Sequence, residues 1–199
     1  MKLILVRHGE TEENASGITQ GHIDGVLSQQ GLDQAERVAR RLSREHIDAI
    51  YASDLGRVVD TTSRILAYHP GITVTYTYDL REMSKGIYDG QAKDLIQDKI
   101  SSLGQPYHEI EWEKGESIKR LLERVSAFYE RISKDHAEDT VLFVSHGGPI
   151  SALFLYLEKR PLTFRKEYGV RNTAVSVISV TREGHTIDLF NCIRHLEEE

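Results

Sequence analysis

The stretch Lys2-Leu3-Ile4-Leu5-Val6-Arg7-His8-Gly9 decides the fold that we expect for this chain. Lys2 to Val6 is a short apolar run with β-branched members, and a polar, glycine-containing segment follows it immediately. Such a run, bounded in this way, is typical of a buried β-strand. The predicted strand ends at Arg7 and His8, which places two chemically competent side chains at its carboxyl end.

A second histidine occupies an equivalent position later in the chain. Residues 140–144 form another continuous apolar run, and Ser145-His146-Gly147 follows it directly. We therefore expect two buried strands that each end at a histidine.

Helical patterns separate the strand-like runs. The clearest begins at Ser117, because apolar residues recur from Ile118 at i, i+3, i+4 and i+7. Further helices are expected at residues 28–42 with Ser28 as N-cap, at about 55–68 with Ser53 or Asp54 as cap, and at 150–157. Further strands are expected at residues 47–53, 73–78, 174–180 and 186–190, the last two joined by a hairpin turn at 182–184.

This alternation predicts a three-layer α/β/α sandwich with a mostly parallel central sheet. Ligands of such sheets bind outside the carboxyl ends of the strands, so His8 and His146 are expected to share one site. Residues from about 85 to 115 contain several glycines and at most a short helix near 92–100. We interpret residues 1–199 as a single domain, with a small lid insertion at about 85–115.

Composition excludes several classes of protein. With 39% hydrophobic and 28% charged residues the chain is typical of a globular protein, and its net charge of −6 argues against a general nucleic-acid binder. No apolar run approaches the roughly 18 to 20 residues of a membrane span, and no signal-peptide pattern is present. The single Cys192 excludes an intrachain disulfide framework, so a cytoplasmic location is expected.

Arg7-His8-Gly9 combines the groups that phosphoryl transfer needs. A neutral imidazole can attack phosphorus, a guanidinium group can neutralise the phosphoryl oxygens, and a residue without Cβ lets a phosphate approach the backbone. The tripeptide alone is equally compatible with a surface loop, and His146 alone with a packed polar residue.

A metal site is the competing interpretation of these histidines. The chain has nine histidines, but a cationic Arg7 beside His8 disfavours a divalent metal. Neither a His-x-x-x-His motif with a glutamate nor a paired cysteine motif occurs. We expect no metal and no cofactor.

Five motifs follow one another along the chain, at residues 5–14 (LVRHGETEEN), 53–57 (SDLGR), 80–90 (LREMSKGIYDG), 115–117 (GES) and 145–148 (SHGG). In this order they closely resemble the histidine phosphatase superfamily, in its phosphoglycerate-mutase-like branch. The ending at 191–196 (NCIRHL) is similar to that branch as well. The resemblance covers nearly the whole chain.

The resemblance implies roles for individual residues. His8 aligns with the nucleophile that becomes a phosphohistidine, and Glu82 with the proton donor. The phosphate pocket aligns with Arg7, Arg57 and His146, and substrate-binding positions with Asn14, Gln20, Gly21 and Gly147.

Two physical requirements follow from these roles. One ring nitrogen of His8 must be unprotonated while an acceptor holds the other. Glu82 must be protonated when the substrate dianion is bound, so the neighbouring Arg81 is expected to point away from it.

The resemblance implies a metal-independent phosphomonoesterase that acts on a small phosphorylated metabolite. A bisphosphate-dependent phosphoglycerate mutase stays open as an alternative, although related mutases are longer and show Trp-Asn where this chain has Glu13-Asn14. A non-catalytic phospholigand binder is the third interpretation. No membrane partner is expected, and a homodimer through an edge strand near 186–190 is possible. The aromatic residues of the lid either enclose a leaving group or pack together: Tyr88, Tyr107, His108 and Trp112.

Overall fold

Six strands form one sheet in the computed structural model, which describes residues 1–197 apart from the side chains of residues 164–166. The strands are β1 (Lys2–Arg7), β2 (Ala49–Ser53), β3 (Val74–Thr77), β4 (Thr140–Ser145), β5 (Val175–Thr181) and β6 (Gly184–Cys192), in the order β3-β2-β4-β1-β5-β6. Neighbours from β3 to β1 pair in parallel, whereas β5 is antiparallel to both β1 and β6. The predicted mostly parallel sheet and its terminal hairpin are confirmed.

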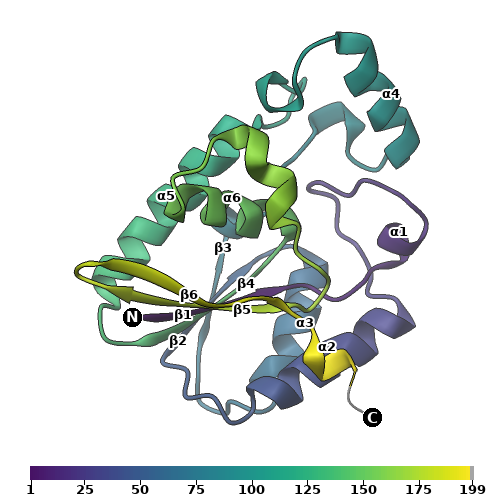
Figure 1. Cartoon of the computed structure of the whole chain (residues 1–199). Helices are drawn as coiled ribbons and strands as arrows, with labels where there is room; N and C mark the ends of the chain where they lie inside the picture. The colour runs from purple at the N-terminus through teal and green to yellow at the C-terminus, as the bar shows by residue number, and fades with distance from the viewer. Residues whose placement is uncertain (198–199) are drawn as a thin grey trace.

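Helices cover both faces of this sheet (Figure 1). The longer helices are α2 (Gln29–Leu42), α3 (Gly56–Leu66), α4 (Lys93–Leu103), α5 (Ile118–Asp135) and α6 (Gly147–Leu157). The shorter segments are α1 (Glu12–Ala15), η1 (Tyr78–Leu80), η2 (Gly86–Tyr88), η3 (Tyr107–Glu109), η4 (Leu162–Tyr168) and η5 (Arg194–Leu196). Within residues 1–197, no helix combines the length and the apolar character needed to cross a membrane.

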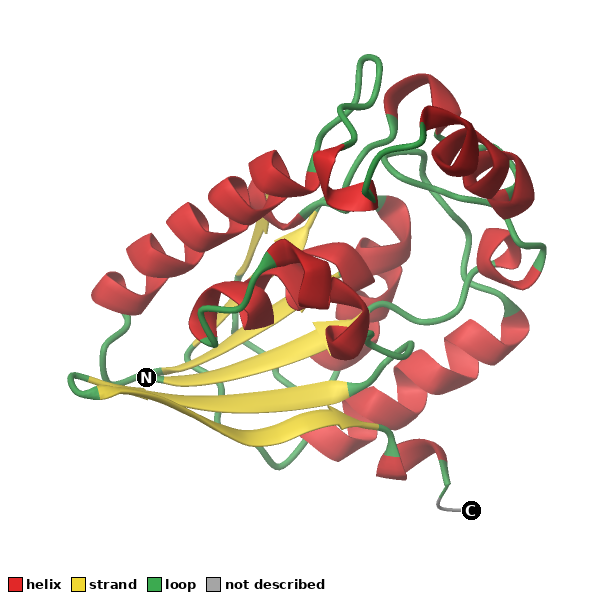
Figure 2. Cartoon of the chain, turned by 45° about the horizontal axis from the view of Figure 1, so that its top comes forward, coloured by secondary structure: helices red, strands yellow, loops and turns green. Residues whose placement is uncertain are grey.

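Alternation along the central strands builds two separate cores. In β1, Leu3 and Leu5 join the core under α5 and α6, whereas Ile4 and Val6 join the core under α2 and α3. A strand that is buried on both faces reads as a continuous apolar run, because neither face needs polar residues. Figure 2 shows the sheet between the two helical layers, which confirms the three-layer sandwich.

Helix starts agree with the sequence in two cases and differ in two. Ser28 caps α2 as predicted, and Ser117, where the second helix was predicted to begin, is the N-cap of α5; each accepts a backbone N–H three residues later. The prediction that Ser53 or Asp54 caps α3 is wrong, because Leu55 is the N-cap and provides no side-chain hydrogen bond. Ser53 still belongs to β2. Asp54 instead pairs with Arg81.

Helix α6 begins at Gly147, before the predicted start at residue 150. The sequence Gly147-Gly148-Pro149 resembles a loop, yet a proline is tolerated in the first turn of a helix, where its missing N–H would have no partner. The earlier start makes His146 the N-cap of α6. The first backbone N–H groups of this helix therefore lie at the sheet edge where we expect the site.

The excursion around α4 is attached to the loop that follows α1. The Thr19 N–H donates to the Gln91 carbonyl, and the Lys93 N–H donates to the Gly17 carbonyl, both at 2.8 Å. Figure 1 places α4 beyond α6 and away from the sheet. Trp112 is buried and makes edge-to-face contacts with Tyr88 and Tyr107, which favours packing over the alternative role of these rings in enclosing a leaving group.

Candidate active site

The pairing of β1 with β4 brings the two histidine motifs together. Arg7 lies opposite Ser145 in the parallel register, and the His8 N–H donates to the Ser145 carbonyl at 3.0 Å. The ring centroids of His8 and His146 are 5.1 Å apart. The side chains are almost completely buried, with exposed fractions of 3% for His8 and 0% for His146. The prediction that one sheet edge carries both histidines is confirmed.

His8 is held in a single neutral tautomer. Its Nδ1 lies 2.7 Å from the Gly9 carbonyl oxygen, and because a carbonyl only accepts, Nδ1 carries the proton and Nε2 keeps its lone pair. Burial lowers the pKa of His8 well below its usual value, and the positive charges of Arg7 and Arg57 lower it further. This is the tautomer that an attacking imidazole requires.

His146 is neutral as well, with the opposite tautomer. Arg57 Nε donates to His146 Nδ1 at 3.2 Å, so the ring proton is on Nε2, which lies 2.9 Å from Ser53 Oγ. Burial and the charge of Arg57 hold the pKa of His146 well below its usual value. Both ring nitrogens therefore have protein partners in this structure, and a phosphate at His146 would replace the Ser53 contact.

Arg57 connects His146 to the loop that follows α1. It is the second residue of α3, where the fold buries its side chain almost completely. Its Nη1 donates to the Ile23 carbonyl at 2.8 Å and its Nη2 to the Gly21 carbonyl at 2.9 Å. Burial lowers the pKa of Arg57 to about 10, so the group remains a cation at neutral pH. Gly21, whose carbonyl accepts from Arg57 Nη2, has a φ of +52°, a backbone conformation that glycine adopts readily.

Arg7 points toward the α6 side of the sheet. Its Nη1 donates to the Val170 carbonyl at 2.6 Å, while its Nε is buried and has no hydrogen-bond partner among the side chains and backbone that the structure describes. Burial lowers the pKa of Arg7, and the nearby Glu82 carboxylate opposes that shift. A buried donor without a partner is uncommon in proteins and suggests that a ligand completes the site.

Glu82 reaches the site from the loop after η1. Its carboxylate accepts from the Met83 N–H at 2.8 Å and from the Gly148 N–H at 3.2 Å. A Cβ at Gly148 would lie 2.0 Å from Glu82 Oε1, so only glycine allows this approach. The neighbouring Arg81 forms a two-pronged ion pair with Asp54, with N–O distances of 2.6 and 2.7 Å, and is directed away from the site as predicted.

A cavity of about 360 Å³ opens beside Arg7 and Glu82. It is lined by Arg7, Glu82, Gly147, Gly148, Ser151, Gly169 and Val170. The lining combines a guanidinium group, a carboxylate and the first turn of α6, whose N–H groups favour a bound anion. In the described part of the chain, no group of three or more His, Cys, Asp or Glu side chains is placed to hold a metal ion.

Two of the predicted substrate-binding residues, Asn14 and Gln20, contact each other and do not line this cavity. Asn14 Nδ2 donates to Gln20 Oε1 at 3.2 Å, and Gln20 Nε2 donates to Glu13 Oε2 at 3.1 Å. Asn14 Oδ1 is buried and has no hydrogen-bond partner in the described part of the structure. Three buried side-chain atoms of the described residues lack partners, and two of them, Arg7 Nε and Asn14 Oδ1, belong to predicted site residues.

Three residues that contact the site were not predicted from the sequence, and the role predicted for Gly9 differs from the one that the structure shows. Ser53 and Gly148 belong to the quoted motifs, so the motifs could have identified them. No local pattern identifies Thr61, whose Oγ1 accepts the Gly9 N–H at 3.1 Å. A Cβ at Gly9 would lie 2.5 Å from the Gly31 carbonyl oxygen. Gly9 therefore allows close packing against α2, and this contact occupies the side on which a phosphate was expected to approach.

Fold and site together define a catalytic class in which a histidine at a strand end is surrounded by arginines, and sequence comparison agrees. The profile of the histidine phosphatase superfamily (branch 1) matches residues 3–193, and the chain belongs to this superfamily. Phosphoserine phosphatase 1 of Hydrogenobacter thermophilus is 34% identical, over 100% of this chain and 95% of the relative. Phosphoglycerate mutase-like protein 4 of Arabidopsis thaliana is also 34% identical, over 99% and 87% of the two chains.

Solved structures agree with the fold. The alpha-ribazole phosphatase from Shigella flexneri superposes with a TM-score of 0.88 at 27% identity, covering 97% of each chain. The resemblance expected from the five motifs is therefore confirmed at the level of the superfamily.

Proposed function

We propose that this protein is a phosphomonoesterase that hydrolyses a small phosphorylated metabolite through a phosphohistidine intermediate on His8. The observation that carries the proposal is the state of His8: a neutral ring whose Nδ1 donates to Gly9 and whose Nε2 keeps a lone pair beside two arginines. Membership of the superfamily and relatives named as phosphatases support the same activity.

In the first half-reaction, His8 Nε2 attacks phosphorus and the bond from phosphorus to the leaving oxygen breaks. Arg7 and the N-terminus of α6 neutralise the phosphoryl oxygens, with Arg57 behind them. Glu82 donates its proton to the leaving oxygen, which departs as an alcohol. A bound dianion places negative charge beside the Glu82 carboxylate and so favours the protonated acid that this step needs.

In the second half-reaction, water attacks the phosphohistidine. Glu82, now a carboxylate, takes a proton from that water, and the bond from phosphorus to His8 Nε2 breaks to release inorganic phosphate. The His8 ring returns to the neutral tautomer with its proton on Nδ1. Neither half-reaction requires a metal ion, so we propose metal-independent catalysis. As a separate proposal, we place the protein in the cytoplasm.

The first test is His8→Ala. We expect it to abolish hydrolysis of para-nitrophenyl phosphate and the acid-labile phosphoenzyme seen after rapid quenching, while the fold is retained. Hydrolysis at the wild-type rate by this variant would refute the mechanism. Wild-type assays with and without EDTA test metal independence, because a metal-dependent enzyme loses activity when the chelator is present.

A panel of phosphate monoesters addresses the substrate and the mutase alternative together. The names of relatives suggest phosphoserine and α-ribazole phosphate as members of the panel. A phosphoglycerate assayed with and without a bisphosphate primer distinguishes transfer to water from transfer to a second substrate oxygen. We expect free phosphate to be released and no primer-dependent isomerisation.

A further inference from the structure

Asn172 and Thr173, which lie shortly before β5, contact the backbone of the proposed nucleophile His8. The Thr173 N–H is shared between the carbonyl oxygens of Arg7 and His8, at 3.0 and 3.3 Å. Asn172 Nδ2 donates to the same His8 carbonyl at 3.0 Å. From the opposite side, Thr61 Oγ1 accepts the Gly9 N–H. The peptide units around His8 are therefore fixed on both sides.

Thr173 has an unusual backbone conformation for its residue type. It is β-branched and completely buried, yet its φ is +52°, in the left-handed region that such residues rarely occupy. Backbone conformations of this kind persist where surrounding contacts impose them, and they cluster at functional sites. Contacts that hold the Thr173 side chain therefore bear on the placement of His8.

His195 supplies the contact on the Thr173 side chain. Its Nε2 lies 3.2 Å from Thr173 Oγ1, and its Nδ1 lies 3.1 Å from Arg41 Nη1. A guanidinium group only donates, so Nδ1 is the acceptor, and the proton on Nε2 is donated to Thr173. His195 has an exposed fraction of 8%, and burial together with Arg41 and Arg37 lowers its pKa to about 4. The ring is therefore neutral at physiological pH.

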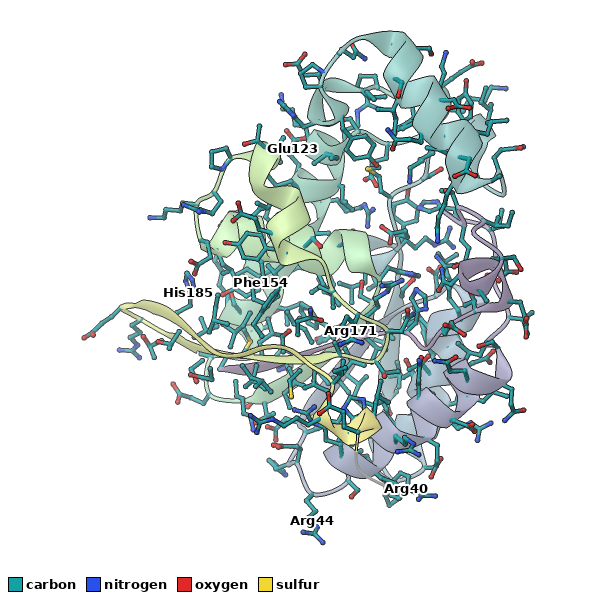
Figure 3. All side chains as sticks on the ribbon, turned by 45° about the vertical axis from the view of Figure 1, so that its right-hand side comes forward. Arg40, Arg44, Glu123, Phe154, Arg171 and His185 are labelled. Carbon is teal, nitrogen blue, oxygen red and sulfur yellow. The ribbon has the colours of Figure 1, made fainter. Side chains whose placement is uncertain are left out.

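Arg41, near the end of α2, differs from the arginines beside it in the chain. Arg40 on the same helix and Arg44 just beyond it extend away from the fold into solvent (Figure 3). Arg41, in contrast, points into the fold: besides its contact with His195, its Nη1 donates to the carbonyl of Cys192, at the end of β6, at 3.1 Å. A continuous line of contacts thus runs from α2 through η5 to the end of β1.

We propose that Arg41, His195 and Thr173 form a positioning relay that holds the backbone of His8 so that Gly9 can accept from His8 Nδ1. None of the three residues lines the cavity beside Glu82, and their contact with the site runs through the carbonyls of Arg7 and His8, so we place them as positioning residues. The inference rests on the proposed function, because positioning matters only if His8 is the nucleophile.

Two matched pairs of variants test the relay. Thr173→Val keeps the β-branched shape and removes the acceptor, whereas Thr173→Ser keeps the hydroxyl. His195→Asn keeps an acceptor near Arg41 and loses the reach to Thr173, whereas His195→Gln keeps a donor that can reach Thr173. Ser176→Ala is the control, because Ser176 is another completely buried hydroxyl next to this segment, and it contacts Asn191 instead of the His8 backbone.

We expect Thr173→Val and His195→Asn to lower kcat about tenfold with KM changed less than about twofold. Thr173→Ser, His195→Gln and Ser176→Ala are expected to stay within about threefold of the wild-type kcat. Single-turnover formation of the phosphohistidine should slow by the same factor as kcat. Nitrogen-15 NMR of the His8 ring should show one neutral tautomer in the wild type and a mixture in Thr173→Val, a signature that simple loss of stability does not produce.

Wild-type kcat and a single His8 tautomer in Thr173→Val and His195→Asn would overturn the relay. Equal loss of kcat in both members of each pair would overturn it too, because the effect would then be general destabilisation. If Thr173→Val does not fold, the His195 pair decides. If His8→Ala itself is active, the proposed function fails, whereas an inactive His8→Ala with unaffected relay variants refutes the relay alone.

Discussion

Arg57 shows how one planar side chain can organise a site. Its three nitrogens contact His146, Ile23 and Gly21, which belong to the start of α6 and to the loop after α1. A guanidinium group can make these contacts in one plane because its donors form a rigid fork. The residue therefore orients a neighbouring imidazole and secures a loop, in addition to contributing positive charge.

Arg57→Lys should consequently behave as a severe substitution. An ammonium group keeps the charge but cannot reach three partners, so we expect kcat/KM to fall roughly 100-fold, with a lower melting temperature. Steady-state kinetics and thermal unfolding measure both effects. Arg64→Lys, on the exposed face of the same helix, is the matched control and should leave both unchanged. An Arg57→Lys enzyme with near wild-type kinetics would contradict the role given to the fork.

At the scale of residues, the sequence predicted which side chains meet but not how they bond. Motif order placed His8, Glu82, Arg57 and His146 at one site, and the geometry brings them together. Without that resemblance, Arg57 reads as a solvated helix arginine, because its partners lie more than 30 positions away in the chain. Long-range partners of this kind leave no local pattern.

Among the elements, the start of α6 bears most directly on the chemistry. Gly147 and Gly148 form its first turn, and the N–H of the second glycine contacts Glu82. The sequence predicted the helix but began it at residue 150, because two glycines and a proline resemble a loop. Tertiary contact with Glu82 and the tolerance of first-turn proline explain the earlier start.

Gly148→Ala tests this arrangement, because it should change stability and activity in different directions. Alanine favours a helix over glycine, so the melting temperature should hold or rise slightly. The new Cβ would lie 2.0 Å from Glu82 Oε1 and must displace that carboxylate. We therefore expect kcat to fall about 10- to 100-fold, as for loss of a positioned general acid.

Gly147→Ala is the matched variant for the fold. The atom nearest to a Cβ at this position is Arg7 Nε, at 3.7 Å, which is an ordinary van der Waals contact. The variant should therefore fold like the wild type. Wild-type kcat in Gly148→Ala would show that Glu82 does not need its contact with α6.

For the whole molecule, three buried neutral histidines predict how stability depends on pH. The pKa values of His8, His146 and His195 are all lowered from 6.5, the last to about 4. Below about pH 6.5 the unfolded chain binds protons that the folded rings do not, so the free energy of unfolding falls as the pH drops. Each ring contributes up to about 1.4 kcal/mol per pH unit.

Urea unfolding between about pH 7 and pH 5 measures this slope. Substitution of His195 by Gln removes one titrating ring, so the slope should become shallower. His46→Gln is the comparison variant, because it removes a histidine whose side chain is 84% exposed instead of a buried one. A His195→Gln slope equal to that of the wild type would contradict the buried neutral state of His195.

The central place of β1 in the sheet has a consequence for how the protein folds. Leu3 pairs with Val141 in β4 on one side and with Ile178 in β5 on the other, both far along the chain. Pairing over such separations is slow, because the chain must close a long loop before it gains a contact. During synthesis, β1 leaves the ribosome before either neighbouring strand exists. His8 at its end can therefore reach the geometry described above only after the segment around Thr173 and β5 has been made.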